Sequence, residues 1–187
     1  PGYALIDTLT LTRHYWLADD NSLRQAPAGD GESLRFNHER FTNIEIPSNQ
    51  EIVLPTDGGK AIELQIVVDP KDAREVGFSV LRSGNAEEQT KISFLRQYGG
   101  RVEIPDLLQI DISESSLKED VYGRPAEIGP LELDAEEKLN LRVFIDRSII
   151  EVFANEKQCL TVRVNPERED SRGISFYSRG SSSELVQ

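Results

Sequence analysis

The sequence predicts an all-β protein built as a sandwich of two antiparallel sheets. Short runs of alternating apolar and polar residues recur along the chain, and period-two alternation places one set of side chains on each face of a sheet. Gly, Pro and Asx residues separate these runs, as is typical of the turns between strands. No segment longer than about ten residues has a convincing helical period. About ten or more closely spaced strands favour two packed sheets over a small barrel.

The first half of the chain contains several of these runs. A turn at Asp19-Asp20-Asn21 follows the opening strand, because short Asx side chains tolerate tight backbone turns. Asp57-Gly58-Gly59 is a second turn, and it precedes the clearest strand of this half. The strands expected here, in chain order, are 9–11, 44–46, 51–54, 62–68, 76–81 and 92–95.

The second half is dominated by a meander of three strands at 139–164. Polar breaks at 146–148 and 155–157 separate the strands, so the segment is expected to fold back on itself twice. The apolar residues expected on one face are Leu139, Leu141, Val143, Ile145, Ile150, Val152, Ala154, Leu160, Val162 and Val164. Strands are also expected at 108–112 and 174–177. Residues 113–130 are expected to be irregular, and the tail after 177 to be soft and polar.

Composition limits the function more than it limits the fold. The 187 residues suit one domain, and the net charge of −12 argues against nucleic acid or an anionic membrane as a partner. No apolar run approaches the ~20 residues of a membrane span, and no signal-peptide pattern opens the chain. The chain begins at Pro1 and contains no Met, which suggests a piece of a longer polypeptide. Cys159 is alone and is expected to be a packed, inert thiol.

Residues 144–155, FIDRSIIEVFAN, followed by a strand at 160–164, resemble the signature of the C-terminal β-sandwich of glycoside hydrolase family 32. Residues 9–27 resemble the start of that sandwich, although Thr12 stands where the family usually has Pro. Residues 113–130 resemble the family's Ser-rich loop and the strand after it. The resemblance extends from about Leu9 to about Tyr177, with the three segments in the expected order.

This family contains invertases, levanases, inulinases and other β-fructofuranosidases. The resemblance implies a concanavalin- or laminin-G-like sandwich that follows a catalytic β-propeller. Residues 1–8 would then be a linker from that upstream propeller, and 9–187 would be the sandwich domain. The family's Asn-Asp-Pro, Arg-Asp-Pro and Glu-Cys motifs are absent, since Asp69-Pro70 follows Val68 and Cys159 follows Gln158. There is also no internal repeat that would make this chain a propeller. We therefore expect no catalytic residue and no cofactor.

Several charged and metal-ligating residues are candidates for a catalytic or metal site. Asp146 and Glu151 could form a carboxylate pair for acid/base catalysis, but Asp146, Arg147 and Ser148 suit a tight turn, which favours a structural role. His14 and His38 lack the spacing of a zinc site. The oxygen-rich turns at 19–21 and 69–72 lack EF-hand spacing. We therefore expect no metal site.

The aromatic residues Tyr15, Trp16, Tyr98 and Tyr122 could stack on a sugar ring, but aromatic residues in strands more often lie in a core or a domain interface. Trp16 is a candidate for contact with the propeller. The acidic pairs 87–88 and 136–137 are expected to be solvated surface. The sequence does not identify which residues would bind carbohydrate.

The sequence thus favours a non-catalytic module of a fructoside-cleaving hydrolase, with the catalytic β-propeller of the same protein as its partner. The alternative is an independent lectin-like module that binds fructans. Assembly as a homo-oligomer and the localisation of the protein are left open.

Overall fold

The computed structural model describes residues 9–97, 105–121 and 123–187. The regular elements among these residues are strands, apart from one short 3-10 helix, η1 (Gly31–Leu34). No helix among them is long and apolar enough to cross a membrane. The strands are β1 (Arg13–Leu17), β2 (Leu23–Pro27), β3 (Ile44–Ile46), β4 (Gln50–Val53), β5 (Ala61–Asp69), β6 (Glu75–Arg82), β7 (Thr90–Leu95), β8 (Leu107–Asp111), β9 (Glu127–Pro130), β10 (Leu139–Asp146), β11 (Ile149–Ala154), β12 (Gln158–Arg163), β13 (Gly173–Arg179) and β14 (Ser183–Leu185).

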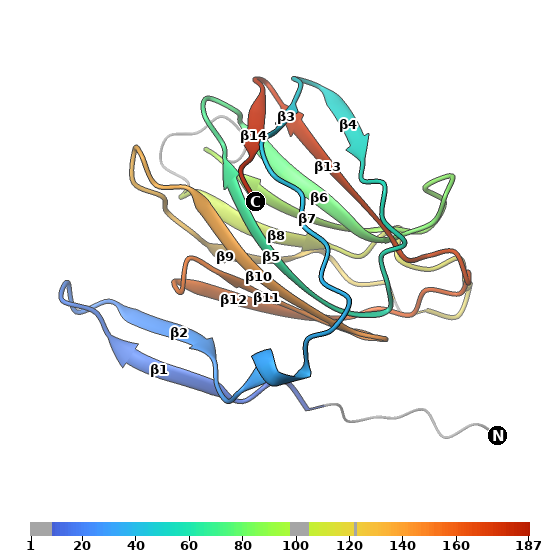
Figure 1. Ribbon diagram of the computed structural model, residues 1–187, viewed down its shortest axis with the longest axis horizontal. Coiled ribbons are helices and arrows are strands. Elements are labelled where there is room, and N and C mark those ends of the chain that lie inside the picture. Colours follow the sequence, from blue (N-terminus) through green and yellow to red (C-terminus); the bar gives the residue numbers. More distant parts are fainter. Residues whose placement is uncertain (1–8, 98–104, 122) are drawn as a thin grey trace.

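Two antiparallel sheets pack face to face, which confirms the predicted sandwich (Figure 1). One sheet has six strands in the order β12-β11-β10-β5-β14-β3, and the other has five in the order β13-β6-β7-β8-β9. Strand β4 extends the second sheet along β13, because the Leu54 N–H donates to the Ile174 carbonyl at 2.9 Å. A separate hairpin, β1-β2, lies outside the six-stranded sheet.

The core lies between the facing sheets and follows the alternation in the sequence. Leu139, Leu141, Val143 and Ile145 of β10 are all at most 4% exposed. The opposing sheet contributes aromatic residues, including Phe78 and Phe176, whose rings stack with centroids 5.6 Å apart. Burial of each such side chain contributes about 1.5–3 kcal/mol, so the described residues contain a complete hydrophobic core of their own.

The predicted meander is confirmed. Val143 of β10 lies opposite Val152 of β11, and Val152 lies opposite Leu160 of β12. The first turn is tight because Asp146 pairs with Ile149, and Arg147 between them adopts a left-handed backbone with φ of 53°. The register places apolar residues inward and leaves the polar set on the outer face.

Three expectations about elements were wrong. Residues 9–11 are not a strand, and the first strand begins at Arg13. Strand β9 falls in the segment expected to be irregular, and β14 lies in the tail expected to be soft. Strand β14 inserts between β5 and β3, so its backbone pairs on both sides, although its three residues are too few to show an alternating pattern. The division at residues 8 and 9 falls at the edge of the described residues and stays a prediction.

Candidate functional site

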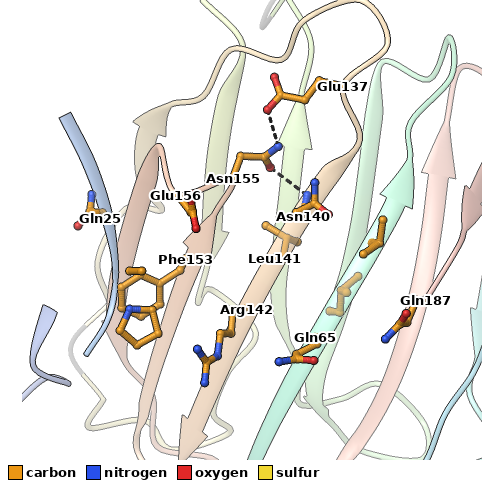
Figure 2. Close-up of a pocket in the computed structure, with 14 residues that line it drawn as sticks. Gln25, Gln65, Glu137, Asn140, Leu141, Arg142, Phe153, Asn155, Glu156 and Gln187 are labelled. Carbon is orange, nitrogen blue, oxygen red and sulfur yellow. Dashed lines mark hydrogen bonds between the residues drawn. The ribbon is translucent and has the colours of Figure 1, made fainter. Parts of the chain in front are cut away.

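An open groove of about 490 Å³ lies on the outer face of the six-stranded sheet. Its floor is formed by β5 and β10, and one wall is formed by β2 of the hairpin (Figure 2). Most of the residues that line it are polar, among them Gln25, Gln65, Asn140, Arg142, Asn155 and Gln187. The groove is therefore a hydrogen-bonding surface with neutral amides as its main groups.

Strand register brings the floor residues together. Gln65 of β5 lies opposite Arg142 of β10, and Arg142 lies opposite Phe153 of β11. The Arg142 Nε donates to Oε1 of Glu63 at 2.6 Å, and its guanidinium lies 5.0 Å from the ring centre of Phe144. Burial alone would raise the pKa of Glu63, but hydrogen bonds from Arg35 and Arg142 outweigh it and hold that pKa below its usual range. The guanidinium is thus fixed in place and its charge is compensated.

The upper end of the groove is held by a network around Asn155. Its side-chain Nδ2 donates to Oε1 of Glu137 at 2.8 Å, and its Oδ1 accepts from the Asn140 N–H at 2.9 Å (Figure 2). Lys157 Nζ donates to the other oxygen of Glu137 at 2.6 Å. Burial raises the pKa of Glu137, but these partners, Lys157 foremost, lower it more. The expectation that 136–137 is solvated surface was therefore wrong for Glu137, although Glu136 is exposed.

The hairpin is fastened to the sheet beside the groove through Glu151. This carboxylate is 2% exposed, and its Oε1 accepts from the Leu11 N–H at 2.6 Å. Arg13 Nη2 lies 3.3 Å from Oε2 of Glu151 and donates to Thr161 Oγ1 at 3.0 Å. Strand β2 adds a backbone bond from the Gln25 N–H to the Glu156 carbonyl at 2.8 Å. The hairpin is thus held against β11 and β12, and its strand β2 borders the groove.

The charged cluster considered from the sequence is divided by this arrangement. Asp146 is exposed at the end of β10, whereas Glu151 is buried beneath the hairpin. The Glu151 carboxylate accepts hydrogen bonds from the Leu11 N–H, from Arg13 and, at 3.5 Å, from Thr161 Oγ1. Arg147 lies in the turn, where its N–H donates to the Lys60 carbonyl. The described residues do not bring Asp146 and Glu151 into a common cleft, and the absence of a catalytic pair stays a prediction.

Glu88 contradicts the expectation that 87–88 is solvated. It is fully buried, and its two carboxylate oxygens accept from the backbone N–H groups of Leu117, Glu167 and Arg168 at 2.9–3.1 Å and from Ser171 Oγ at 2.6 Å. Burial alone would raise the pKa of Glu88, but this set of donors outweighs burial and holds that pKa below its usual range. Glu88 therefore ties two loops together, while its exposed neighbour Glu87 pairs with Arg168.

The remaining candidates lie apart from one another. Among the described residues, no three His, Cys, Asp or Glu side chains gather as a metal site. His14 stacks on Trp16 with ring centroids 5.3 Å apart, and His38 is exposed. Asp20 accepts from Ser22, and Asp69 accepts from the Lys71 N–H, as residues in turns do. Tyr98 and Tyr122 lie outside the described residues.

Cys159 is partly buried on the outer face of β12, opposite Phe153 of β11. Burial raises the pKa of its thiol to about 11, although the Arg13 charge nearby acts in the opposite direction. A thiol with this pKa is almost entirely protonated near neutral pH, as expected for a packed, inert cysteine.

The groove itself was missed from the sequence. Gln65 and Arg142 each belong to the polar set of a strand, and that alternation was visible. Their pairing joins positions far apart in the chain, however, and no short-range pattern indicates which strands become neighbours. Gln25 reaches the same place from a hairpin outside the sheet.

Solved structures share this sandwich. Fructan 1-exohydrolase IIa from Cichorium intybus superposes with a TM-score of 0.80 over 93% of this chain and 38% of its own, at 18% identity. Exo-inulinase from Aspergillus awamori gives 0.72 over 94% of this chain and 34% of its own, at 21% identity. The fold is thus that of the β-sandwich carried by this class of carbohydrate-active enzyme.

Sequence comparison identifies the family. The family model "Glycosyl hydrolases family 32 C terminal" matches residues 30–187. The chain belongs to this family, as its motifs predicted. Levanase of Bacillus subtilis (strain 168) is 31% identical over 159 residues, which cover 82% of this chain and 22% of the levanase. Fructan 1-exohydrolase of Aegilops tauschii is 32% identical over 190 residues, which cover 84% and 32%. The chain therefore spans about a fifth to a third of the length of these relatives.

Proposed function

We propose that this chain is the supporting, non-catalytic module of a protein that hydrolyses fructosyl bonds in sucrose or fructans. Its partner is a catalytic β-propeller domain of the same protein. The observation that carries the proposal is the match of 158 residues, 30–187, to the C-terminal family model, together with the small share of each relative that the chain spans.

The surroundings of the buried carboxylates favour a non-catalytic role for this chain. A retaining glycosidase needs two carboxyl groups about 5–5.5 Å apart that flank the scissile bond in a cleft. Glu151 is instead covered by the hairpin and Glu88 is enclosed by two loops, and both are occupied by donors from the protein. These two buried carboxylates therefore have structural roles.

The hairpin supports docking on another domain. Strands β1 and β2 pair only with each other among the described strands, and a lone two-stranded hairpin is marginal in water. Toward its turn it exposes Tyr15, Leu17 and Leu23, with Leu17 and Leu23 directly opposite each other. Exposed apolar residues that cluster in this way mark contact surfaces. The matched family segment begins after β2, and this supports the proposal that the hairpin contacts a preceding domain.

Two experiments test the proposal. First, the purified chain is assayed for fructose release from sucrose, levan and inulin, and we expect none. Turnover that disappears in Glu151→Gln would overturn the non-catalytic assignment.

Second, Leu17→Asp is introduced into the complete protein that carries the catalytic domain, with Val53→Asp on β4 as the matched exposed control. Docking through the hairpin predicts faster thermal inactivation in Leu17→Asp alone. Equal inactivation of both variants and the parent would contradict it.

A further inference from the structure

The groove beside the hairpin contains hydrogen-bonding groups that the fold leaves unused. Within the described part of the chain, the Gln65 side-chain amide makes no hydrogen bond, and Arg142 uses only its Nε. Gln25 accepts from Arg13 through Oε1 at 3.4 Å, which leaves its Nε2 unused. Gln187 likewise engages only its Oε1, with Arg40 at 3.3 Å. Figure 2 shows Gln65 and Arg142 on adjacent strands, with Gln25 on the opposite wall.

These groups point to an uncharged ligand. Arg142 and Arg35 share the carboxylate of Glu63, and Arg35 also pairs with Glu32, so two carboxylates balance the two guanidinium groups. The negative charge of Glu137 is balanced by Lys157 at 2.6 Å. Glu156 is the remaining charged side chain in the lining and carries no ion pair among the described residues. It adds an acceptor and disfavours anions, in keeping with the net charge of −12. A phosphate or carboxylate ligand would thus meet no uncompensated cation here.

The same groups suit a ligand rich in hydroxyls. The Gln65 amide offers both a donor and an acceptor, and the Nε2 groups of Gln25 and Gln187 offer further donors. The two terminal nitrogens of Arg142 form a fork that can donate to neighbouring oxygens. Pro27, which is partly exposed on the hairpin wall, adds apolar surface next to them. The volume of about 490 Å³ lies within the range of about 300–1,000 Å³ for small-ligand sites. Alternating donors and acceptors beside an apolar edge match the alternating hydroxyls and C–H groups of a sugar chain.

We propose that this groove binds a short stretch of a neutral oligosaccharide, and that in the complete protein this is a segment of a fructan chain. Identifying the sugar as a fructan rests on the proposed function above. Binding of a neutral oligosaccharide as such rests on the groove alone. Gln65 and Arg142 form the floor of the site, and Gln25 contacts the ligand from the hairpin wall.

The chain contains its own core and both sheets, so the site can be tested on the 187-residue chain. We would titrate the isotopically labelled chain with 1-kestose, levan oligosaccharide and maltotriose, and follow the side-chain amide resonances of Gln25 and Gln65 by NMR. Saturable shifts at millimolar fructan oligosaccharide are expected. Gln65→Ala should weaken binding about tenfold through lost hydrogen bonds.

Gln109→Ala is the matched control, because Gln109 faces outward between buried Leu108 and Ile110 on the other sheet. It should bind as the parent does, and unchanged backbone spectra will show that both variants fold. Absence of saturable shifts with all three sugars would overturn the site, as would undiminished binding by Gln65→Ala. A further outcome is that the isolated chain binds no sugar while Gln65 is buried against the catalytic domain in the complete protein. That pair of results would assign the groove to domain docking, which overturns this proposal and leaves the proposed function intact. If maltotriose binds as tightly as the fructan oligosaccharides, the groove is a site for neutral oligosaccharides but is not specific for fructan.

Discussion

Replacing Glu88 by Gln tests whether one buried carboxylate holds two loops of the sandwich together. Its oxygens accept from three backbone N–H groups and from Ser171 Oγ. A glutamine keeps the shape but exchanges one oxygen for a donor. The hydroxyl of Ser171 can reverse its role and accept, but a backbone N–H cannot. In either orientation the new NH₂ therefore faces a backbone N–H, that of Leu117 or that of Arg168.

The expected cost follows from these contacts. A buried N–H that loses its acceptor costs about 1–3 kcal/mol, and the surviving bonds lose the assistance of the negative charge. We therefore expect Glu88→Gln to lower the free energy of unfolding by about 2–4 kcal/mol, measured by urea denaturation at pH 7. Glu87→Gln, on an exposed neighbour, should change it by about 0.5 kcal/mol or less.

The pH dependence provides an independent check of the same argument. The pKa of Glu88 is lowered in the folded state, so its contribution is present above the unfolded pKa of about 4.3 and is lost as pH falls through the lower folded value. The stability difference between the parent and Glu88→Gln should thus shrink below about pH 4. A loss below about 1 kcal/mol at pH 7, or a difference that does not shrink in acid, would refute the role assigned to this carboxylate.

Three further changes probe other parts of the structure. Arg13→Ala leaves Glu151 buried without its ion-pair partner, so it should destabilise the hairpin attachment by about 3–5 kcal/mol and speed hydrogen exchange in β1 and β2; unchanged exchange would contradict the anchor. Tyr177→Phe removes the hydroxyl that lies 2.7 Å from Ser93 Oγ, and urea denaturation should show a loss of about 1–2 kcal/mol. Because the pKa of Cys159 is raised to about 11, only about one thiol in a thousand is ionised at pH 8, so its alkylation by iodoacetamide should be slow and should accelerate with each step toward pH 11; rapid reaction at pH 8 would show an exposed thiol.

Local patterns in the sequence predicted the parts of the fold that depend on neighbours in the chain. The meander of β10, β11 and β12 was predicted because its strands alternate cleanly and connect through short turns, such as the one at Arg147. Strand β14 was missed because three residues, Ser-Glu-Leu, are too few to show a period, and its pairing is supplied by β5 and β3.

The candidate site depended on contacts that no local pattern reveals. Glu88 was expected to be solvated because an acidic pair usually is, yet its donors arrive from loops about 30 and 80 positions further along the chain. The groove required β5 to pair with β10 and the hairpin to fold over β11. Alternation placed Gln65 and Arg142 on a polar face, but only the sheet order made them neighbours.

The outer face of the six-stranded sheet links the two proposed roles through a single strand. Strand β2 is the partner of β1 in the hairpin that we propose docks on the catalytic domain, and it also forms a wall of the groove. The hairpin is held to the sheet by few bonds, chiefly those to Glu151 and Glu156, so its position is the least constrained part of the site. A catalytic domain that fixes the hairpin would also fix Gln25 opposite Gln65. Because binding energies at linked sites are reciprocal, a sugar that bridges this wall and the floor should in turn favour the docked hairpin.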